Sequence, residues 1–277
     1  MQNEYFKSYS GTDYIPGRPE LPILLDDMKR IPTTYKQAGV SLPVFLLHNM
    51  AHIELNAIDL CWNTIVMALL HPIRYKSEWD ITDNTCLDLF DFINDFIKVA
   101  KDEARHFSDL SQRLVELSSY YGAVTSHKAI WSMARDTQYS LLERVVIGNM
   151  VLEGRGLDSG ERLISKMIGC GDMKSCAIVK TICHEEEDHV RIGVKWFDKM
   201  ARITHALMTS QQEEDNLSKL SFDDFQTELF QQIVLTNYGP LPSPFNHDSR
   251  KAANMKECWY EDIARPKITK TTKTTKH

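Results

Sequence analysis

One pattern of acidic and histidine residues occurs twice in this chain and limits how the chain can fold. Glu103 is followed three residues later by His106, and Glu186 is followed in the same way by His189. In an α-helix, residues three positions apart lie about 60° apart on one face, so both side chains of a pair can reach a common point. One such pair is weak support for a metal site, because it also arises by chance. Its repetition on two long apolar segments is more specific.

Four segments carry apolar side chains with the 3.6-residue period of a helix that buries one face. The second and fourth segments carry the Glu-x-x-His pairs on their apolar stripes, and the first and third carry the lone glutamates Glu54 and Glu153. Almost no run alternates apolar and polar residues as a strand does, so we expect an all-α fold. The predicted helices cover about residues 43–70, 87–120, part of 126–157, and 174–208.

A buried glutamate is costly unless it is paired or bound to a metal. Four converging carboxylates would also repel one another strongly without a cation between them. Four carboxylates and two imidazoles are the ligand set of di-iron and di-manganese helix bundles. The pattern therefore predicts a ferritin-like four-helix bundle with a dinuclear metal centre, and the alternative is exposed charges on misjudged helix faces. The predicted metal ligands are Glu54, Glu103, His106, Glu153, Glu186 and His189.

Residues next to the predicted ligands are candidates to orient them. The run Asp102-Glu-Ala-Arg-His106 resembles the Asp-Glu-x-Arg-His signature of di-iron oxygenases and desaturases. This resemblance implies that Asp102 hydrogen-bonds a metal-bound histidine on the facing helix, and that Arg105 pairs with a nearby carboxylate. The corresponding position in the second half is Glu185 rather than an aspartate. Its role is left open between an equivalent contact and a solvated charge.

Two glycines follow Glu153 within three residues, although glycine costs about 1 kcal/mol relative to alanine inside a helix. Gly154 and Gly156 would be explained by space for oxygen or substrate, by a π-bulge that re-aims Glu153, or by close helix packing. His52 and His184 each precede a predicted ligand by two residues, which is about 160° around the helix. We expect these two histidines to point away from the metals.

The C-terminal part of the chain also supplies candidates for a substrate pocket. Phe245, Asn246 and Arg250 are candidates to line an entrance, together with Gly154 and Gly156 near the predicted metals. A packed clasp between the end of the chain and the bundle is the alternative, and the sequence favours the clasp.

The composition argues against several other classes of protein. The chain has 277 residues and a net charge of -6, which gives no general attraction to nucleic acid or to an anionic membrane. Asn56, Asp59 and Asn63 interrupt the most apolar stretch, so we predict no membrane span. The first 13 residues lack the apolar core of a signal peptide, and six scattered cysteines predict free thiols. We therefore expect a soluble, cytoplasmic protein.

Prolines and changes of pattern divide the chain into four parts. Closely spaced prolines predict an extended arm packed on the domain, with a short helix near residues 24–30. A further helix near 222–235 belongs to a C-terminal extension, and the Lys/Thr-rich tail has the composition of a disordered segment. The predicted parts are 1–42 for the proline-rich arm, 43–208 for the four-helix bundle, 209–264 for the helical extension and 265–277 for the tail.

Several segments of this chain resemble those of a known family. They are Pro16-Gly-Arg-Pro19, Ala51-His-Ile-Glu-Leu-Asn-Ala-Ile-Asp59, Asp102-Glu-Ala-Arg-His-Phe107, Glu153-Gly-Arg-Gly-Leu-Asp158, His189-Val-Arg-Ile-Gly193 with Trp196-Phe197, and Pro244-Phe-Asn246 with Trp259-Tyr260. The family is the ferritin-like domain of unknown function 455, and the resemblance runs from about residue 16 to residue 264. It implies a ferritin-like fold and a dinuclear metal site but no substrate. A more distant similarity is to the tRNA-modifying di-iron hydroxylases.

Three hypotheses about function follow. The first is a di-iron carboxylate oxidoreductase, an oxygenase or hydroxylase that uses dioxygen and an electron donor to oxidise an unidentified small organic substrate. Mixed carboxylate and imidazole ligation suits two iron ions, with manganese or a mixed Mn/Fe pair as alternatives. Leu157 stands where the multicomponent hydroxylases have a threonine, which is a departure from their oxygen chemistry. The second hypothesis is an iron-binding or ferroxidase protein, and the third is tRNA hydroxylation, which the acidic balance disfavours.

Overall fold

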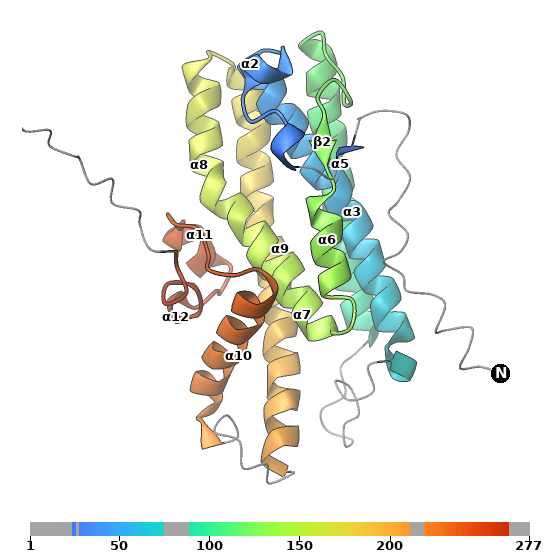
Figure 1. Ribbon diagram of the computed structural model, residues 1–277, viewed down its shortest axis with the longest axis vertical. Helices are drawn as coiled ribbons and strands as arrows, with labels where there is room; N and C mark the ends of the chain where they lie inside the picture. Colours follow the sequence, from blue (N-terminus) through green and yellow to red (C-terminus); the bar gives the residue numbers. More distant parts are fainter. Residues whose placement is uncertain (1–23, 26–27, 75–88, 211–218, 266–277) are drawn as a thin grey trace, which may run out of the picture.

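The computed structural model describes residues 24–25, 28–74, 89–210 and 219–265, which are mainly helical (Figure 1). Among these residues, the strands are β1 (Leu24–Leu25) and β2 (Ser126–His127), which pair in parallel with Leu24 opposite Ser126. The predicted all-α fold is confirmed. Most of the proline-rich arm and nearly all of the Lys/Thr-rich tail lie outside the described residues.

The first two long helices pack closely against each other. α3 covers Leu42–Arg74 and α5 covers Leu89–Glu116. α5 ends a few residues before the predicted end near residue 120, because Ser118 adopts a left-handed φ of 57°. The N–H of Ser119 then donates to the carbonyl of Leu114 at 2.9 Å, which closes the last turn.

The third long segment runs without a break from Leu141 to Gly169. It consists of α7 (Leu141–Val145), the π-helix η2 (Val146–Leu152) and α8 (Glu153–Gly169). The helix predicted within residues 126–157 therefore extends further along the chain, to Gly169. Burial of an apolar face, here with Leu157 and Met167, supplies most of a helix's stability, so the glycine-rich stretch before residue 161 stays helical.

The fourth long helix is α9 (Met173–Ser210), which contacts α5, η2 and α8. The carboxylate of Asp172 accepts the Ser175 N–H at 3.0 Å and so caps its first turn. In Figure 1, α3, α5, α8 and α9 lie side by side, and the short helix α6 (Ala129–Asp136) lies along α3.

The buried stripe of α5 shows why this sequence places polar groups in the interior. Its apolar members recur every three or four residues, as a helix that buries one face requires. Glu103 and His106 occupy two positions of the same stripe, and both are completely buried. The packing of α5 therefore places a carboxylate and an imidazole in the interior of the molecule. The buried residues of α5 are Phe92, Phe96, Val99, Ala100, Glu103, His106, Leu110 and Leu114.

The C-terminal extension packs on the bundle through aromatic side chains. It contains α10 (Phe222–Asn237), α11 (His247–Ala252) and α12 (Glu257–Tyr260). The predicted helix at 222–235 corresponds to α10. The Trp259 ring lies 5.2 Å from the Phe197 ring of α9, centroid to centroid, in an edge-to-face arrangement.

The described part of the N-terminal arm consists of short pieces. After β1 come the 3₁₀ helix η1 (Met28–Arg30) and α2 (Tyr35–Ala38). The short helix predicted near 24–30 is thus a two-residue strand and one 3₁₀ turn, with residues 26–27 outside the described residues. The strand forms because Leu24 and Leu25 pair with the backbone at Ser126 and His127, a distant contact that local sequence does not encode.

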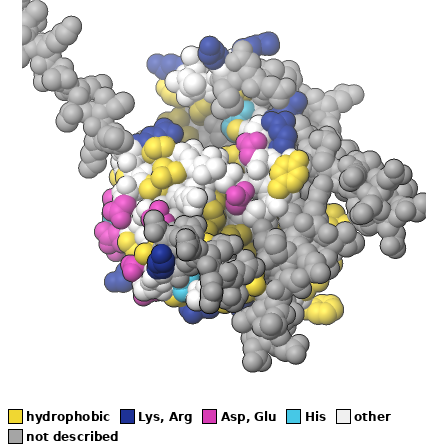
Figure 2. Space-filling view, turned by 60° about the horizontal axis from the view of Figure 1, so that its bottom comes forward, with side chains coloured by type: hydrophobic (Ala, Val, Ile, Leu, Met, Phe, Trp, Pro, Cys, Tyr) yellow, Lys and Arg dark blue, Asp and Glu magenta, His cyan; other side chains and the backbone are white. Residues whose placement is uncertain are grey.

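Among the described residues, the stretch Leu42–Leu70 of α3 is long and apolar enough to cross a membrane by length and composition. Half of its most apolar part is buried inside the protein. Figure 2 shows a face of the molecule on which acidic, basic and hydrophobic side chains lie interspersed among the described residues.

Candidate metal centre

Three helices bring four of the predicted ligands to one interior point. Glu54 of α3, Glu103 and His106 of α5, and Glu186 of α9 each offer one ligand atom, and these atoms lie within 4.8 Å of one another. All four residues are buried. They are distant in sequence, so helix packing creates the group. This group could hold metal ions.

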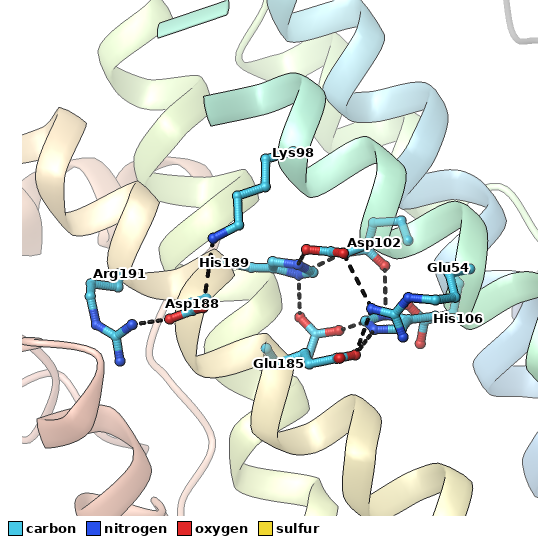
Figure 3. Close-up of polar contacts among 11 residues, drawn as sticks. Glu54, Lys98, Asp102, His106, Glu185, Asp188, His189 and Arg191 are labelled. Atoms are coloured by element: carbon cyan, nitrogen blue, oxygen red, sulfur yellow. Dashed lines mark hydrogen bonds and ion pairs between the residues drawn. The ribbon is translucent and has the colours of Figure 1, made fainter. Parts of the chain in front are cut away.

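Both histidines turn the same ring nitrogen toward the carboxylates (Figure 3). Nδ1 of His106 lies 3.5 Å from an oxygen of Glu103 and 3.5 Å from an oxygen of Glu186. It also lies 3.6 Å from Glu54. Nδ1 of His189 lies 2.9 Å from Glu103 and 3.0 Å from Glu186. Glu103 and Glu186 therefore each lie close to the Nδ1 atoms of both histidines.

The far ring nitrogens face a second pair of carboxylates. Nε2 of His106 donates to Glu185 at 2.8 Å. Nε2 of His189 lies 3.6 Å from Asp102, which is a contact on the predicted side but too long for a hydrogen bond. Arg105 joins the two outer carboxylates, at 2.9 Å from Glu185 and 3.2 Å from Asp102. Glu185 thus makes the equivalent contact that the sequence left open.

Glu153 is the first residue of α8, directly after the π-helix η2. A π-helix adds a residue to each turn, so it rotates the following side chains relative to a regular helix. The structure therefore contains the π-bulge that was one explanation for the glycines after Glu153. Glu153 is half-buried, and its carboxylate interacts with Glu186, Glu103 and His189.

Burial and mutual repulsion perturb the carboxylates of this cluster. Burial, and then the negative charge of Glu103, raise the pKa of Glu54 well above its usual range. Burial and the charge of Glu186 do the same to the pKa of Glu153. Burial and Glu103 also raise the pKa of Glu186. For Glu103, burial acts in the same direction, but contacts with Glu54 and both histidines outweigh it and lower its pKa.

The pKa values of both imidazoles are also raised, although burial acts against this. Burial alone lowers the pKa of an imidazole, yet Glu103 and Glu54 raise the pKa of His106 to about 11. Glu186 and Glu103 likewise raise the pKa of His189 above its usual range against the effect of burial. The site therefore attracts positive charge, which protons or metal cations can provide.

The donor set fits a metal ion by a further criterion. Both carboxylate oxygens of Glu103 and Nδ1 of His106 are buried and make no hydrogen bond of good geometry among the described residues, although Nδ1 of His189 lies 2.9 Å from one of these oxygens. Buried polar atoms without partners are rare and costly. A cation in the middle of these atoms would satisfy all of them. Carboxylate oxygens and imidazole nitrogens are ligands that suit iron and manganese.

Two cysteines next to the cluster were not singled out from the sequence. Cys61 is buried on α3, two helical turns after Glu54, and its thiol is close enough to Glu103, Glu153 and Glu186 for their charges, after burial, to raise its pKa. Burial and Glu186 raise the pKa of the Cys183 thiol to about 12. The seven-residue spacing from Glu54 to Cys61 is the signal that identifies a shared helix face.

The candidate pocket residues form a packed joint. Arg250 is 1% exposed, and its guanidinium donates to the Asp158 carboxylate at 2.8 and 2.6 Å. The Asn246 N–H donates to the same carboxylate at 2.9 Å, and the Phe245 ring lies 4.9 Å from the guanidinium carbon. A Cβ at Gly154 would lie 3.3 Å from Arg250, so this glycine makes room for the joint. These contacts favour the clasp over the entrance.

The two neighbouring histidines point elsewhere, as predicted. His52 has hydrogen-bond contacts with the Tyr121 hydroxyl at 2.9 Å and the His127 carbonyl at 2.8 Å. The side chain of His184 is 84% exposed and lies 3.7 Å from Glu187. Gly156 has open space where a Cβ would lie, so packing does not require a glycine there.

Comparison with known proteins gives a family but no activity. The chain is 30% identical over 205 residues to a Haemophilus influenzae protein described only as an uncharacterized protein. The match covers 72% of this chain and 65% of that relative's length. No solved structure matches the chain significantly. The family model described as "Protein of unknown function (DUF455)" matches residues 2–261, nearly the whole sequence, and the chain therefore belongs to the DUF455 family.

Proposed function

We propose that this protein is a di-iron carboxylate oxidoreductase that uses dioxygen to oxidise a small organic substrate, as an oxygenase or hydroxylase does. The observation that carries the proposal is the cluster of buried carboxylates and imidazoles whose potential ligand atoms lie within 4.8 Å of one another, and in which the Glu103 oxygens and His106 Nδ1 make no hydrogen bond of good geometry among the described residues. This is the donor set of ferritin-like dinuclear centres.

The residues proposed to hold two ions come from all four long segments. Glu103 and Glu186 each lie near both imidazoles, so these four side chains would hold the ions together. Glu54 and Glu153 would each complete one side. Two iron ions fit the mixed oxygen and nitrogen donors, with manganese or a Mn/Fe pair as alternatives. When bound, such ions supply the electrons that dioxygen chemistry requires, and an external donor restores them.

The protein's own groups would prepare the site. Glu185 accepts a hydrogen bond from the Nε2–H of His106, so Nδ1 is the ring nitrogen that would bind a metal ion once its own proton is released. Arg105 holds Glu185 in place at 2.9 Å. Burial of Glu103, His106 and His189 excludes water from the centre.

The competing proposal is a ferroxidase or iron-storage protein, and the more distant one is a tRNA hydroxylase. We propose that the protein acts in the cytoplasm on a small substrate, without nucleic acid or membrane. Iron stoichiometry separates the first two proposals: a dinuclear enzyme binds about two ions per chain, and a storage protein takes up many more.

Oxygen consumption tests the proposal. The protein, loaded anaerobically with ferrous iron, should consume dioxygen repeatedly when a chemical reductant is supplied. Glu103→Ala should abolish this consumption, and Glu161→Ala, an exposed glutamate of α8, should leave it intact. Equal rates in both variants would overturn the proposal, as would uptake of many iron ions without turnover.

A further inference from the structure

A groove of about 590 Å³ lies between α9 and the C-terminal extension. Its α9 wall includes Asp188 and Lys199, and Trp259 of α12 contributes from the opposite side. Its volume falls in the range of about 300–1,000 Å³ that is typical of sites for small organic molecules. The cationic residues that line it are Lys98, Arg191, Lys195, Lys199 and Lys256.

Positive charge exceeds negative charge in this groove. Five cations and two carboxylates line it, which leaves a surplus of three positive charges. One carboxylate, Asp188, is already paired with Lys98 at 3.7 Å and with Arg191, and Figure 3 shows it between these two side chains. The other, Asp198, is paired at 2.9 Å with Arg202 outside the groove. Neither carboxylate is left to repel an anion on its own.

The surplus remains after the cations' own partners are counted. Lys195 pairs with Asp95 at 2.6 Å and Lys256 pairs with Asp223 at 3.0 Å, so six cations face four carboxylates in the wider cluster. Lys199 has no carboxylate within ion-pair distance in the part of the chain that is described. Its ammonium group lies 4.3 Å from the centroid of the Trp196 ring instead. This local excess of cations, in a chain of net charge -6, favours anions over cations at the groove.

One buried donor at the groove also lacks a partner. Trp259 lines the groove and is 1% exposed, and its indole N–H has no hydrogen-bond partner among the described residues. An indole nitrogen can only donate, so it seeks an acceptor. Lys256, which extends over the Trp259 ring at 5.5 Å from its centroid, places a cation beside the same side chain. A ligand rich in acceptor oxygens would suit the ammonium group of Lys256 at the surface of the groove, whereas the indole N–H is shielded from solvent.

We propose that this groove binds a small organic molecule through a phosphate group. A phosphate monoester carries about -1.5 to -2 charges at pH 7 and three strong acceptor oxygens, which matches a lysine-rich lining better than a single carboxylate does. The inference stands on the groove alone and does not depend on the metals. It leaves the organic part of the ligand open.

Isothermal titration of the full-length protein with phenyl phosphate at low ionic strength tests the site, with benzoate as the carboxylate probe. Phenyl phosphate should bind saturably and at least tenfold more tightly than benzoate. Lys199→Glu should weaken the binding at least tenfold. The matched control is Lys180→Glu, which makes the same change at an exposed site of α9 outside the groove and should change affinity less than twofold.

Further variants separate binding in the groove from other effects. Binding should persist in Glu103→Ala, because the phosphate does not bind at the metals. If Lys199→Glu loses the circular dichroism of the parent, Lys98→Gln at a half-exposed position replaces it and should weaken binding several-fold. The inference is overturned if Lys199→Glu and Lys180→Glu weaken binding equally or if Glu103→Ala loses binding. It is also overturned if benzoate binds as tightly as phenyl phosphate. Lys199-dependent binding of a short single-stranded RNA far above that of phenyl phosphate would also overturn it.

Discussion

Nε2 of His106 on α5 donates to Glu185 on α9 at 2.8 Å, while Nε2 of His189 on α9 faces Asp102 on α5 at 3.6 Å. Each helix thus supplies a Glu-x-x-His pair and also the carboxylate behind its neighbour's histidine. Both outer carboxylates directly precede the glutamate of a pair in sequence. Glu185 makes the shorter contact although an aspartate was expected at its position.

Removing the outer carboxylate should weaken metal binding without removing a ligand. Loss of such a partner typically costs about 10- to 100-fold in metal affinity, because the histidine loses its orientation and basicity. We therefore expect Glu185→Ala to bind iron at least tenfold more weakly in competition with a chelator. The adjacent Glu187→Ala is the control, since Glu187 contacts the exposed His184 rather than a ligand. Equal affinities in the two variants would contradict the role of Glu185.

The stability of the metal-free protein should fall as pH rises. Folding raises the pKa of Glu54 above 4.5 and that of His106 from 6.5 to about 11, so the native state binds more protons than the unfolded state in this range. The stabilisation from His106 is fully present below pH 6.5 and is lost as pH approaches 11. The lowered pKa of Glu103 acts in the opposite sense only under more acidic conditions.

Metal binding should reverse this trend, because the ligands must release protons to bind a cation. Scanning calorimetry at about pH 5.5 and about pH 8 should show a larger increase in melting temperature on iron addition at the higher pH. An increase that does not vary with pH would show that these buried groups do not exchange protons for metal.

The two glycines that follow Glu153 should respond differently to alanine. Gly156 lies in a helix with open space around its Cβ position, so Gly156→Ala should stabilise the protein by up to about 1 kcal/mol. A Cβ at Gly154 would meet the Arg250 guanidinium at 3.3 Å, and two hydrogen bonds to Asp158 prevent that group from moving. Overpacking costs about 1–3 kcal/mol, so urea unfolding should show Gly154→Ala to be less stable than Gly156→Ala by about that amount. Equal stabilities would remove the packing role of Gly154.

The clasp between Arg250 and Asp158 gives a prediction that separates structure from substrate binding. Asp158→Ala leaves a buried guanidinium unpaired, which should cost about 3–5 kcal/mol of unfolding free energy. The double variant Asp158→Ala/Arg250→Met should recover much of this loss, because no charge then remains buried. If Asp158→Ala unfolds like the parent in urea, Arg250 is not a clasp.

The sequence predicted the buried cluster of Glu and His side chains because the information for it is local. The spacing of Glu103 and His106 fixes their common face on any helix, and the apolar stripe of α5 fixes the direction of that face. The positions of the helices followed from the same periodicity. The predicted end of α5 was a few residues too late, because the left-handed conformation of Ser118 ends that helix.

The rest depended on contacts between distant segments. Arg250 and Asp158 are 92 residues apart, and no local pattern reveals that they meet. The continuity of α8 across its glycines depends on a face buried against α9, and the basic groove depends on how the extension packs on α9. The position of Glu185 before Glu186 made it a candidate. Its contact with His106 depends on how α5 and α9 are oriented relative to each other, which the sequence does not reveal.

Anomalous X-ray diffraction at the iron edge, from crystals of iron-loaded protein, tests the central claim most directly. We predict two anomalous peaks among Glu54, Glu103, His106, Glu153, Glu186 and His189, with both histidine Nδ1 atoms directed at them. Anomalous peaks only at the surface, or iron-loaded crystals with no peak among these six side chains, would contradict the account.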